Sequence, residues 1–366
     1  MSKKTIITGI ALFSMFFGGG NLIYPLSIGM QGGSNLFLAF LGFILSGVFL
    51  PFVGVITVIL YEGKVKDVFN ILGPGLRTLF PLVLLAFWIP LGSAPRCISL
   101  VYTSFFQYGF EISHLVFVAI YSSITFLACL NKSRIIDLLG YVMTPVIILS
   151  ILAVVLKSLT LEVEPVISSL QGSALFVEAL DSGLKTQDFI AAFFFSSMIC
   201  DLMKYERKQS GLKPFVFYSC LTGVSLLSIV YLAMIICGSI NASLLTGLRG
   251  DQLLFALLTR MGGGFIASFS LIIIGFGCLS TSIALTAVFA NYLNEVTNGK
   301  ISFKSGAALT CLVGMIPALF GFELISAIIS PSMEVLYPIL LVVSCIAVLK
   351  KIIPKAKGCV HQVVEN

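Results

Sequence analysis

Long apolar segments, most of them long enough to cross a membrane, follow one another along the whole chain between short polar stretches. A helix needs about 20 apolar residues to cross the hydrocarbon core of a bilayer. The pattern therefore predicts an all-α polytopic membrane protein with about ten spans, and residues 158–187 as an external loop. The predicted spans cover residues 5–30, 36–60, 78–107, 114–130, 135–157, 188–204, 213–238, 264–292, 304–322 and 324–349.

Composition supports this class and excludes several others. Of the 366 residues, 58% are hydrophobic and 10% are charged, whereas a soluble domain carries about 25% charged residues. The net charge of +6 reflects lysines and arginines in loops, so we expect lipid and no nucleic acid as a partner. The nine cysteines form no C-x-x-C pair and only two histidines occur, so we expect neither a metal centre nor a cofactor.

The distribution of basic residues predicts the orientation of the chain. With the N-terminus inside, 17 of the 22 lysines and arginines fall in cytoplasmic segments, four fall outside, and Arg96 lies within a span. Cytoplasmic loops carry an excess of lysine and arginine in membrane proteins. We therefore expect both termini on the cytoplasmic side.

The run Gly18-Gly19-Gly20-Asn21 interrupts the first span. Each glycine costs roughly 1 kcal/mol against alanine in a helix, so the run favours a break. Backbone groups freed at membrane depth are tolerated only where they line a cavity or bind something. The same run also fits a close helix–helix contact, because small residues are common at such contacts.

Ten spans allow a duplication of five plus five, in which the second half is inverted relative to the first. The repeats would cover residues 5–157 and 188–350 of one transporter domain, 1–366. Helix 6 then corresponds to helix 1, and the sequence Phe193 to Ser197 predicts an interruption there as well, because two serines follow three bulky rings. Two interrupted segments in corresponding positions indicate the substrate site of a secondary transporter.

Hydroxyl side chains gather in the middle of the eighth predicted span. Ser280, Thr281 and Ser282 are followed by Thr286 one turn later. Hydroxyl and carbonyl oxygens suit a small hard cation such as Na⁺. The alternative is that these hydroxyls bond to carbonyls one turn earlier in their own helix.

Charged residues inside predicted spans are costly and usually face a partner or a water-filled path. Arg96 and Glu334 lie at similar depths, some 12–17 Å from the outer ends of their helices at 1.5 Å per residue. They are candidates for an outer gate formed by an ion pair, with separate structural roles as the alternative. Asp188 lies near the start of helix 6, where we expect it to cap the helix.

Six motifs follow one another along nearly the whole chain, and these are Gly18 to Pro25, Pro90 to Arg96, Ile136 to Gly140 with Pro145, Lys185 to Asp188, Cys278 to Thr286, and Ile329 to Pro338. Together they resemble the motifs of the bacterial branched-chain amino acid transport system II carriers. This LIVCS family belongs to the amino acid–polyamine–organocation superfamily, which has the LeuT-type inverted repeat. The resemblance implies cation-coupled uptake of leucine, isoleucine and valine, usually with Na⁺, across the bacterial cytoplasmic membrane.

The resemblance also implies roles for individual residues. The backbone around Gly19 and Gly20, beside Gly18 and Asn21, would take the substrate carboxylate. Carbonyls near Phe195 and Ser196 would receive the ammonium group, and Phe194, Phe195 and Tyr102 would surround the apolar side chain. The carbonyls of Ser14 and Phe17, together with Thr281 and Ser282, would form the Na⁺ site.

The chain departs from the family pattern in three places. Gln187 replaces the usual Met, Ser196 stands where Gly is common, and the ten predicted helices are two fewer than relatives usually have. The first two departures concern substrate preference, and the last concerns packing or the oligomeric state, which the sequence leaves open.

Other classes of function remain as alternatives to a Na⁺ symporter. A proton-coupled transporter of another small nutrient, or an amino-acid sensor, would use the same residues. An intramembrane enzyme would need clustered histidines, acids or metal ligands, and the sequence has none. It also has no GxxxxGK[ST] loop for direct ATP use. We therefore expect a transporter and no enzyme.

Overall fold

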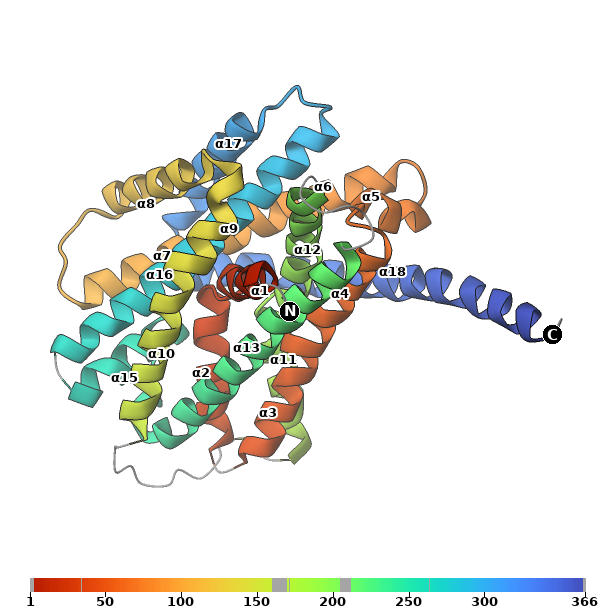
Figure 1. The fold of residues 1–366 in the computed structure, drawn as a ribbon. Helices are drawn as coiled ribbons and strands as arrows, with labels where there is room; N and C mark the ends of the chain where they lie inside the picture. Colours follow the sequence, from red (N-terminus) through yellow and green to blue (C-terminus); the bar gives the residue numbers. More distant parts are fainter. Residues whose placement is uncertain are drawn as a thin grey trace.

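The computed structural model describes residues 3–33, 35–159, 170, 172–204, 212–262 and 264–364, and all of their regular structure is helical. Figure 1 shows α1 and α2 within the bundle, while the C-terminal end of α18 projects away from it. The long helices are α1 Lys3–Phe16, α2 Gly19–Gly32, α3 Leu36–Ile44, α4 Leu50–Leu60, α6 Leu76–Trp88, α7 Ala94–Gln107, α8 His114–Cys129, α10 Thr144–Ser158, α11 Gly172–Lys185, α12 Asp188–Lys204, α13 Leu212–Ile240, α15 Leu253–Gly262, α16 Gly264–Val296, α17 Phe303–Ala318 and α18 Phe322–Val364.

Every predicted span is helical, although not every one passes a strict test of length and apolarity. Within the described residues, six helices are long and apolar enough to cross a membrane, and α1 with α2 makes a seventh when the bent pair is counted as one. Helices α8 and α17 are apolar but shorter. A polytopic all-α membrane protein is therefore confirmed.

Three of the spans contain a short π-helical segment where they would otherwise be continuous α-helix. These segments are η1 Leu45–Phe49, η3 Ile89–Ser93 and η5 Leu138–Met143. Each is followed directly by a helix that carries proline at its first or second residue. Short π-helical segments are frequent at functional sites. Because η3 ends three residues before Arg96, this part of the third span is a candidate functional region.

The predicted break in helix 6, between Phe193 and Ser197, was placed at the wrong residues. Residues 188–204 form the continuous helix α12, so Phe193 to Ser197 are helical throughout. The break lies earlier, at Thr186 and Gln187, and Gln187 has a φ of 65°, which non-glycine residues seldom adopt. The predicted external loop 158–187 was also wrong in part, because residues 172–185 form α11.

Close helix contacts fix the positions of the two broken segments. A Cβ on Gly29 of α2 would lie 2.1 Å from the carbonyl oxygen of Ile235 in α13, and one on Gly238 would lie 2.1 Å from that of Leu26. On the other side, a Cβ on Gly42 of α3 would lie 2.6 Å from the carbonyl oxygen of Phe176 in α11. These glycines let backbones touch, as small residues do between membrane helices.

Candidate functional site

The first span breaks sharply between α1 and α2. The two helices are bent by 73°, and Phe17 and Gly18 lie between them. The Gly18 amide donates to the Phe16 carbonyl at 2.7 Å and to Asn21 Oδ1 at 3.2 Å. Because the first N–H groups of a helix have no partner within it, the start of α2 presents backbone donors and a positive dipole end at mid-membrane depth.

Gly18 and Gly20 allow neighbouring elements to approach this break. A Cβ on Gly18 would lie 2.9 Å from Thr281 Oγ1 of α16, and one on Gly20 would lie 3.3 Å from the Cα of Thr186. The glycines thus bring together the first break, the second break and the hydroxyl cluster. Close packing, one of the two alternatives that the sequence left open, therefore applies to this run.

A small buried cavity lies where the two breaks meet. Its volume is about 20 Å³, which is enough for about one water molecule. A ligand larger than water would need the surrounding helices to move apart. The residues around it are Met15, Phe16, Gly18, Gly19, Gly20, Asn21, Trp88, Ser93, Arg96, Cys97, Thr186, Asp188, Ala191, Phe195, Thr281 and Leu285.

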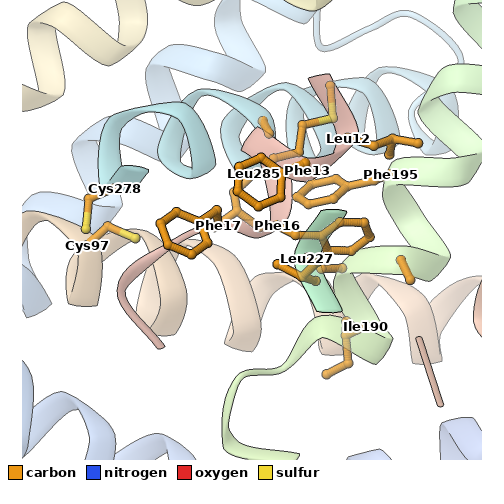
Figure 2. Close-up of a cluster of buried hydrophobic side chains, with 14 of the residues drawn as sticks. Leu12, Phe13, Phe16, Phe17, Cys97, Ile190, Phe195, Leu227, Cys278 and Leu285 are labelled. Atoms are coloured by element: carbon orange, nitrogen blue, oxygen red, sulfur yellow. The ribbon is translucent and has the colours of Figure 1, made fainter. Parts of the chain in front are cut away.

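Aromatic and aliphatic side chains form the apolar wall of the cavity. The rings of Phe16 and Phe195 meet edge to face at 5.5 Å between centroids, and Trp88 lies 6.5 Å from Phe195. Figure 2 shows Phe16, Phe195 and Leu285 in one buried cluster. This wall is suited to an apolar side chain.

Asp188 is a buried carboxylate that joins three helices at the cavity. It is 1% exposed, and Asn21 Nδ2 lies 2.8 Å from each of its oxygens. The Tyr231 hydroxyl of α13 donates to Oδ2 of the same carboxylate. Asp188 begins α12, as a helix cap does, but its hydrogen bonds to Asn21 and Tyr231 also reach α2 and α13.

Arg96 is the buried cation of the same cavity. It is 5% exposed, and one guanidinium nitrogen donates to the Tyr24 hydroxyl at 2.9 Å. The guanidinium carbon lies 5.0 Å from the ring centroid of Phe322, and Nε has no hydrogen-bond partner among the described residues. A buried nitrogen donor without a partner is costly, and this one belongs to a residue that lines the cavity.

The predicted ion pair between Arg96 and Glu334 is not formed in this structure. Glu334 lies in a separate pocket of about 300 Å³ between α4, α11 and α18. Gln187 also lines that pocket, whereas its neighbours Thr186 and Asp188 line the smaller cavity. The Gln187 side chain accepts hydrogen bonds from Trp88 and Ser93, both at 2.9 Å. Gln187 therefore lies between the two cavities.

The hydroxyl cluster of α16 does face the end of α1, but with a different set of residues from the one predicted. Thr281 Oγ1 donates to the Met15 carbonyl at 3.0 Å, and Ser280 donates to the Ser14 carbonyl at 2.8 Å. Ser280 also bonds back to Gly277 at 2.9 Å, so the alternative of an intrahelical bond holds in part.

Ser282, by contrast, faces away from α1. Its hydroxyl lies 3.1 Å from that of Tyr121 in α8, in another small pocket. Ser282 was therefore wrongly grouped with Thr281, and Ser280 takes its place against the end of α1. The buried Ser14 hydroxyl oxygen has no partner among the described residues.

Part of the predicted substrate site is assembled and part is not. Gly18 to Asn21 and Phe195 line the cavity, while Tyr102, Phe194 and Ser196 do not. Tyr102 stacks on His114 with 4.0 Å between ring centroids, and Phe194 packs on Phe193 and Tyr292. The Ser196 hydroxyl bonds to the Ala192 carbonyl inside α12, so no freed carbonyl is available there for an ammonium group.

Sequence reasoning missed Asp188 and Thr186 as cavity residues. The signal was present in the run Thr186-Gln187-Asp188, three polar residues directly before an apolar span. The prediction relied instead on the aromatic rings and serines further along, and it placed the break eight or nine residues after its true position. The sequence does not predict that Trp88 and Ser93 contact the second break, because only the folded structure brings the third span to Gln187.

Two broken helices that meet at a buried polar cavity are the arrangement by which secondary transporters hold substrate and ions. The chain is similar to a solved manganese transporter of Eremococcus coleocola, with a TM-score of 0.59, 15% identity and coverage of 96% of this chain and 78% of that one. It is also similar to MhsT in complex with L-phenylalanine, with a TM-score of 0.54, 19% identity and coverage of 94% and 88%. These two likenesses establish the fold.

The chain belongs to the branched-chain amino acid transport protein family, whose sequence profile matches residues 1–365. A provisionally named branched-chain amino acid carrier of Staphylococcus aureus (strain bovine RF122 / ET3-1) is 27% identical over 97% of this chain and 84% of its own length. A second carrier of this kind, from strain USA300, matches equally well. The family consists of transport proteins, so the expectation of an amino acid transporter and no enzyme is confirmed.

Proposed function

We propose that this protein is a Na⁺-coupled symporter that imports leucine, isoleucine and valine by alternating access. The observation that carries the proposal is the cavity at the α1–α2 break, which joins a helix N-terminus, an apolar wall and a hydroxyl cluster. The backbone at Gly19 and Gly20 takes the substrate carboxylate, helped by the dipole of α2. The wall around Phe16, Phe195 and Leu285 takes the branched side chain.

The proposed ion site lies between the end of α1 and the middle of α16. The carbonyls of Ser14 and Met15, with the hydroxyls of Ser280 and Thr281, already face one another at 2.8 and 3.0 Å. The Phe17 carbonyl also faces α16, because a Cβ on Gly277 would lie 3.1 Å from it. These neutral oxygens suit a monovalent cation. Thr281 lines the substrate cavity as well, which couples the two sites.

The same proposal places the protein in the bacterial cytoplasmic membrane with both termini inside. The excess of basic residues in the predicted cytoplasmic segments supports this orientation. In this orientation the cavity lies near the middle of the membrane. The helices α1 and α12 lie on its cytoplasmic side, and α2 and α11 lie on its outer side.

Uptake of labelled leucine into proteoliposomes, with and without an inward Na⁺ gradient, tests the function. The proposal predicts accumulation that depends on the Na⁺ gradient and is inhibited by isoleucine and valine. Uptake that follows a proton gradient and ignores Na⁺ would assign the coupling to protons. Binding of leucine without any uptake would indicate a sensor.

Substitutions in the hydroxyl cluster test the ion site separately. We expect Ser280→Ala and Thr281→Ala each to raise the Na⁺ concentration for half-maximal uptake by about tenfold, because each removes one oxygen ligand. Ser282→Ala is the matched control, since that hydroxyl faces Tyr121, and should change this concentration less than about twofold. Unchanged Na⁺ dependence in both of the first two variants would rule out this site.

A further inference from the structure

The cavity contains one buried cation and one buried anion that do not pair with each other. Arg96 and Asp188 are 5% and 1% exposed, and both line the cavity at the α1–α2 break. No ion pair joins them in the parts of the chain that the structure describes. Charges buried in a membrane protein usually pair or face a transported species, because desolvation is costly.

The environments of the two charges leave each of them able to accept a ligand. One guanidinium nitrogen of Arg96 donates to the Tyr24 hydroxyl, and Nε has no hydrogen-bond partner among the described residues. Asp188 accepts from the neutral donors Asn21 and Tyr231, which orient the carboxylate without neutralising it. An amide and a hydroxyl leave the negative charge uncompensated, so a cationic group in the cavity would be attracted to it.

An α-amino acid carries the two complementary charges in one small molecule. We propose that Arg96 binds the α-carboxylate of the substrate and that Asp188 binds its α-ammonium group. This inference rests on the proposed function and adds the residues that select a zwitterion. It also replaces the backbone carbonyls near Phe195 and Ser196 as the ammonium site, because those residues lie within the continuous helix α12.

The pair explains how the cavity would reject related metabolites with the same carbon skeleton. A branched carboxylic acid without an amino group leaves Asp188 buried and unpaired. A branched amine without a carboxylate leaves Arg96 in the same condition. A site built to pair a buried charge discriminates strongly against a ligand that lacks the partner.

The only tryptophan of the chain provides a direct reading of ligand binding. Trp88 lines the cavity and is 2% exposed, so its fluorescence should respond to an occupied site. Purified protein in detergent is titrated with leucine, with 4-methylpentanoate, which lacks the ammonium group, and with 3-methylbutylamine, which lacks the carboxylate. We expect each fragment to bind wild type at least about tenfold more weakly than leucine.

Two charge-neutralising variants then assign the charges. Asp188→Asn should weaken leucine by roughly 10- to 100-fold and leave 4-methylpentanoate unchanged or tighter. Arg96→Gln should weaken leucine similarly and leave 3-methylbutylamine unchanged. Arg134→Gln, which neutralises an exposed arginine outside the cavity, is the matched control and should bind all three ligands as wild type does.

The outcomes separate this inference from the proposed function. Wild type that does not bind leucine contradicts the proposed function. Wild type that binds leucine and either fragment equally well overturns the zwitterion site, and this comparison needs no variant to fold. Variants that weaken leucine and the matched fragment equally also overturn it, because that result indicates a structural role for the two charges.

Discussion

Asn21→Leu should reduce leucine uptake by roughly 10- to 100-fold while leaving a folded protein. Asn21 holds the break together, because Oδ1 accepts from the Gly18 amide and Nδ2 donates to Asp188. Leucine has nearly the same size but has neither group, so the buried carboxylate loses a donor that lies 2.8 Å from both of its oxygens. Losing a hydrogen bond to a charged group costs about 1.5–3 kcal/mol, which predicts a loss of uptake of roughly 10- to 100-fold.

Asn241→Leu is the matched control for this change. Asn241 is also fully buried, and its amide donates to Ser158 at 2.7 Å, but it does not line the cavity. Both variants remove a buried amide, so both should lose some stability. Uptake per folded molecule, measured after size-exclusion chromatography, should fall only in Asn21→Leu. Equal loss in the two variants would contradict a special role for Asn21.

Gly29→Ala should destabilise the whole bundle. The added Cβ would lie 2.1 Å from the Ile235 carbonyl oxygen, and a backbone atom within a helix cannot move aside without shifting α13. Overpacking of this kind costs about 1–3 kcal/mol and sometimes more. We expect the melting temperature in detergent to fall by about 1–4 °C, because an unfolding entropy of about 2.1 cal/mol/K per residue makes each kcal/mol worth roughly 1.3 °C in a chain of 366 residues.

Gly275→Ala in α16 is the control for that prediction. A Cβ at Gly275 meets no atom within 4 Å, and alanine is the better helix former by about 1 kcal/mol. Its melting temperature should therefore equal or exceed that of wild type. A similar fall in both variants would show that the α2–α13 contact does not account for the effect.

The class of the protein and the first break could be predicted from the sequence because both depend on local chemistry. Apolar length defines a span wherever it occurs, and three adjacent glycines weaken a helix in any context. The same logic found Thr281, since a hydroxyl at mid-membrane depth needs a partner. The structure supplies that partner in the Met15 carbonyl at 3.0 Å.

The side chains assigned to the wrong neighbours share one cause, which is that side-chain direction depends on the rotation of a helix in the bundle. Ser280 and Ser282 are equivalent in the sequence, yet one faces α1 and the other faces α8. Arg96 and Glu334 match in depth, but their helices place them in different cavities. The depth of a residue within its span can be predicted from the sequence, whereas the rotation of the helix about its axis depends on packing.

Photo-crosslinking with the diazirine analogue of leucine tests most directly whether the cavity at the α1–α2 break binds the substrate. Proteoliposomes are labelled with and without excess leucine, and the modified residues are mapped by mass spectrometry. We predict leucine-protected labelling of residues that line the cavity, such as Met15, Phe16, Cys97, Ala191, Phe195, Thr281 and Leu285. Leucine-protected labelling confined to residues 330–341, beside the pocket of about 300 Å³, would contradict substrate binding at the α1–α2 break.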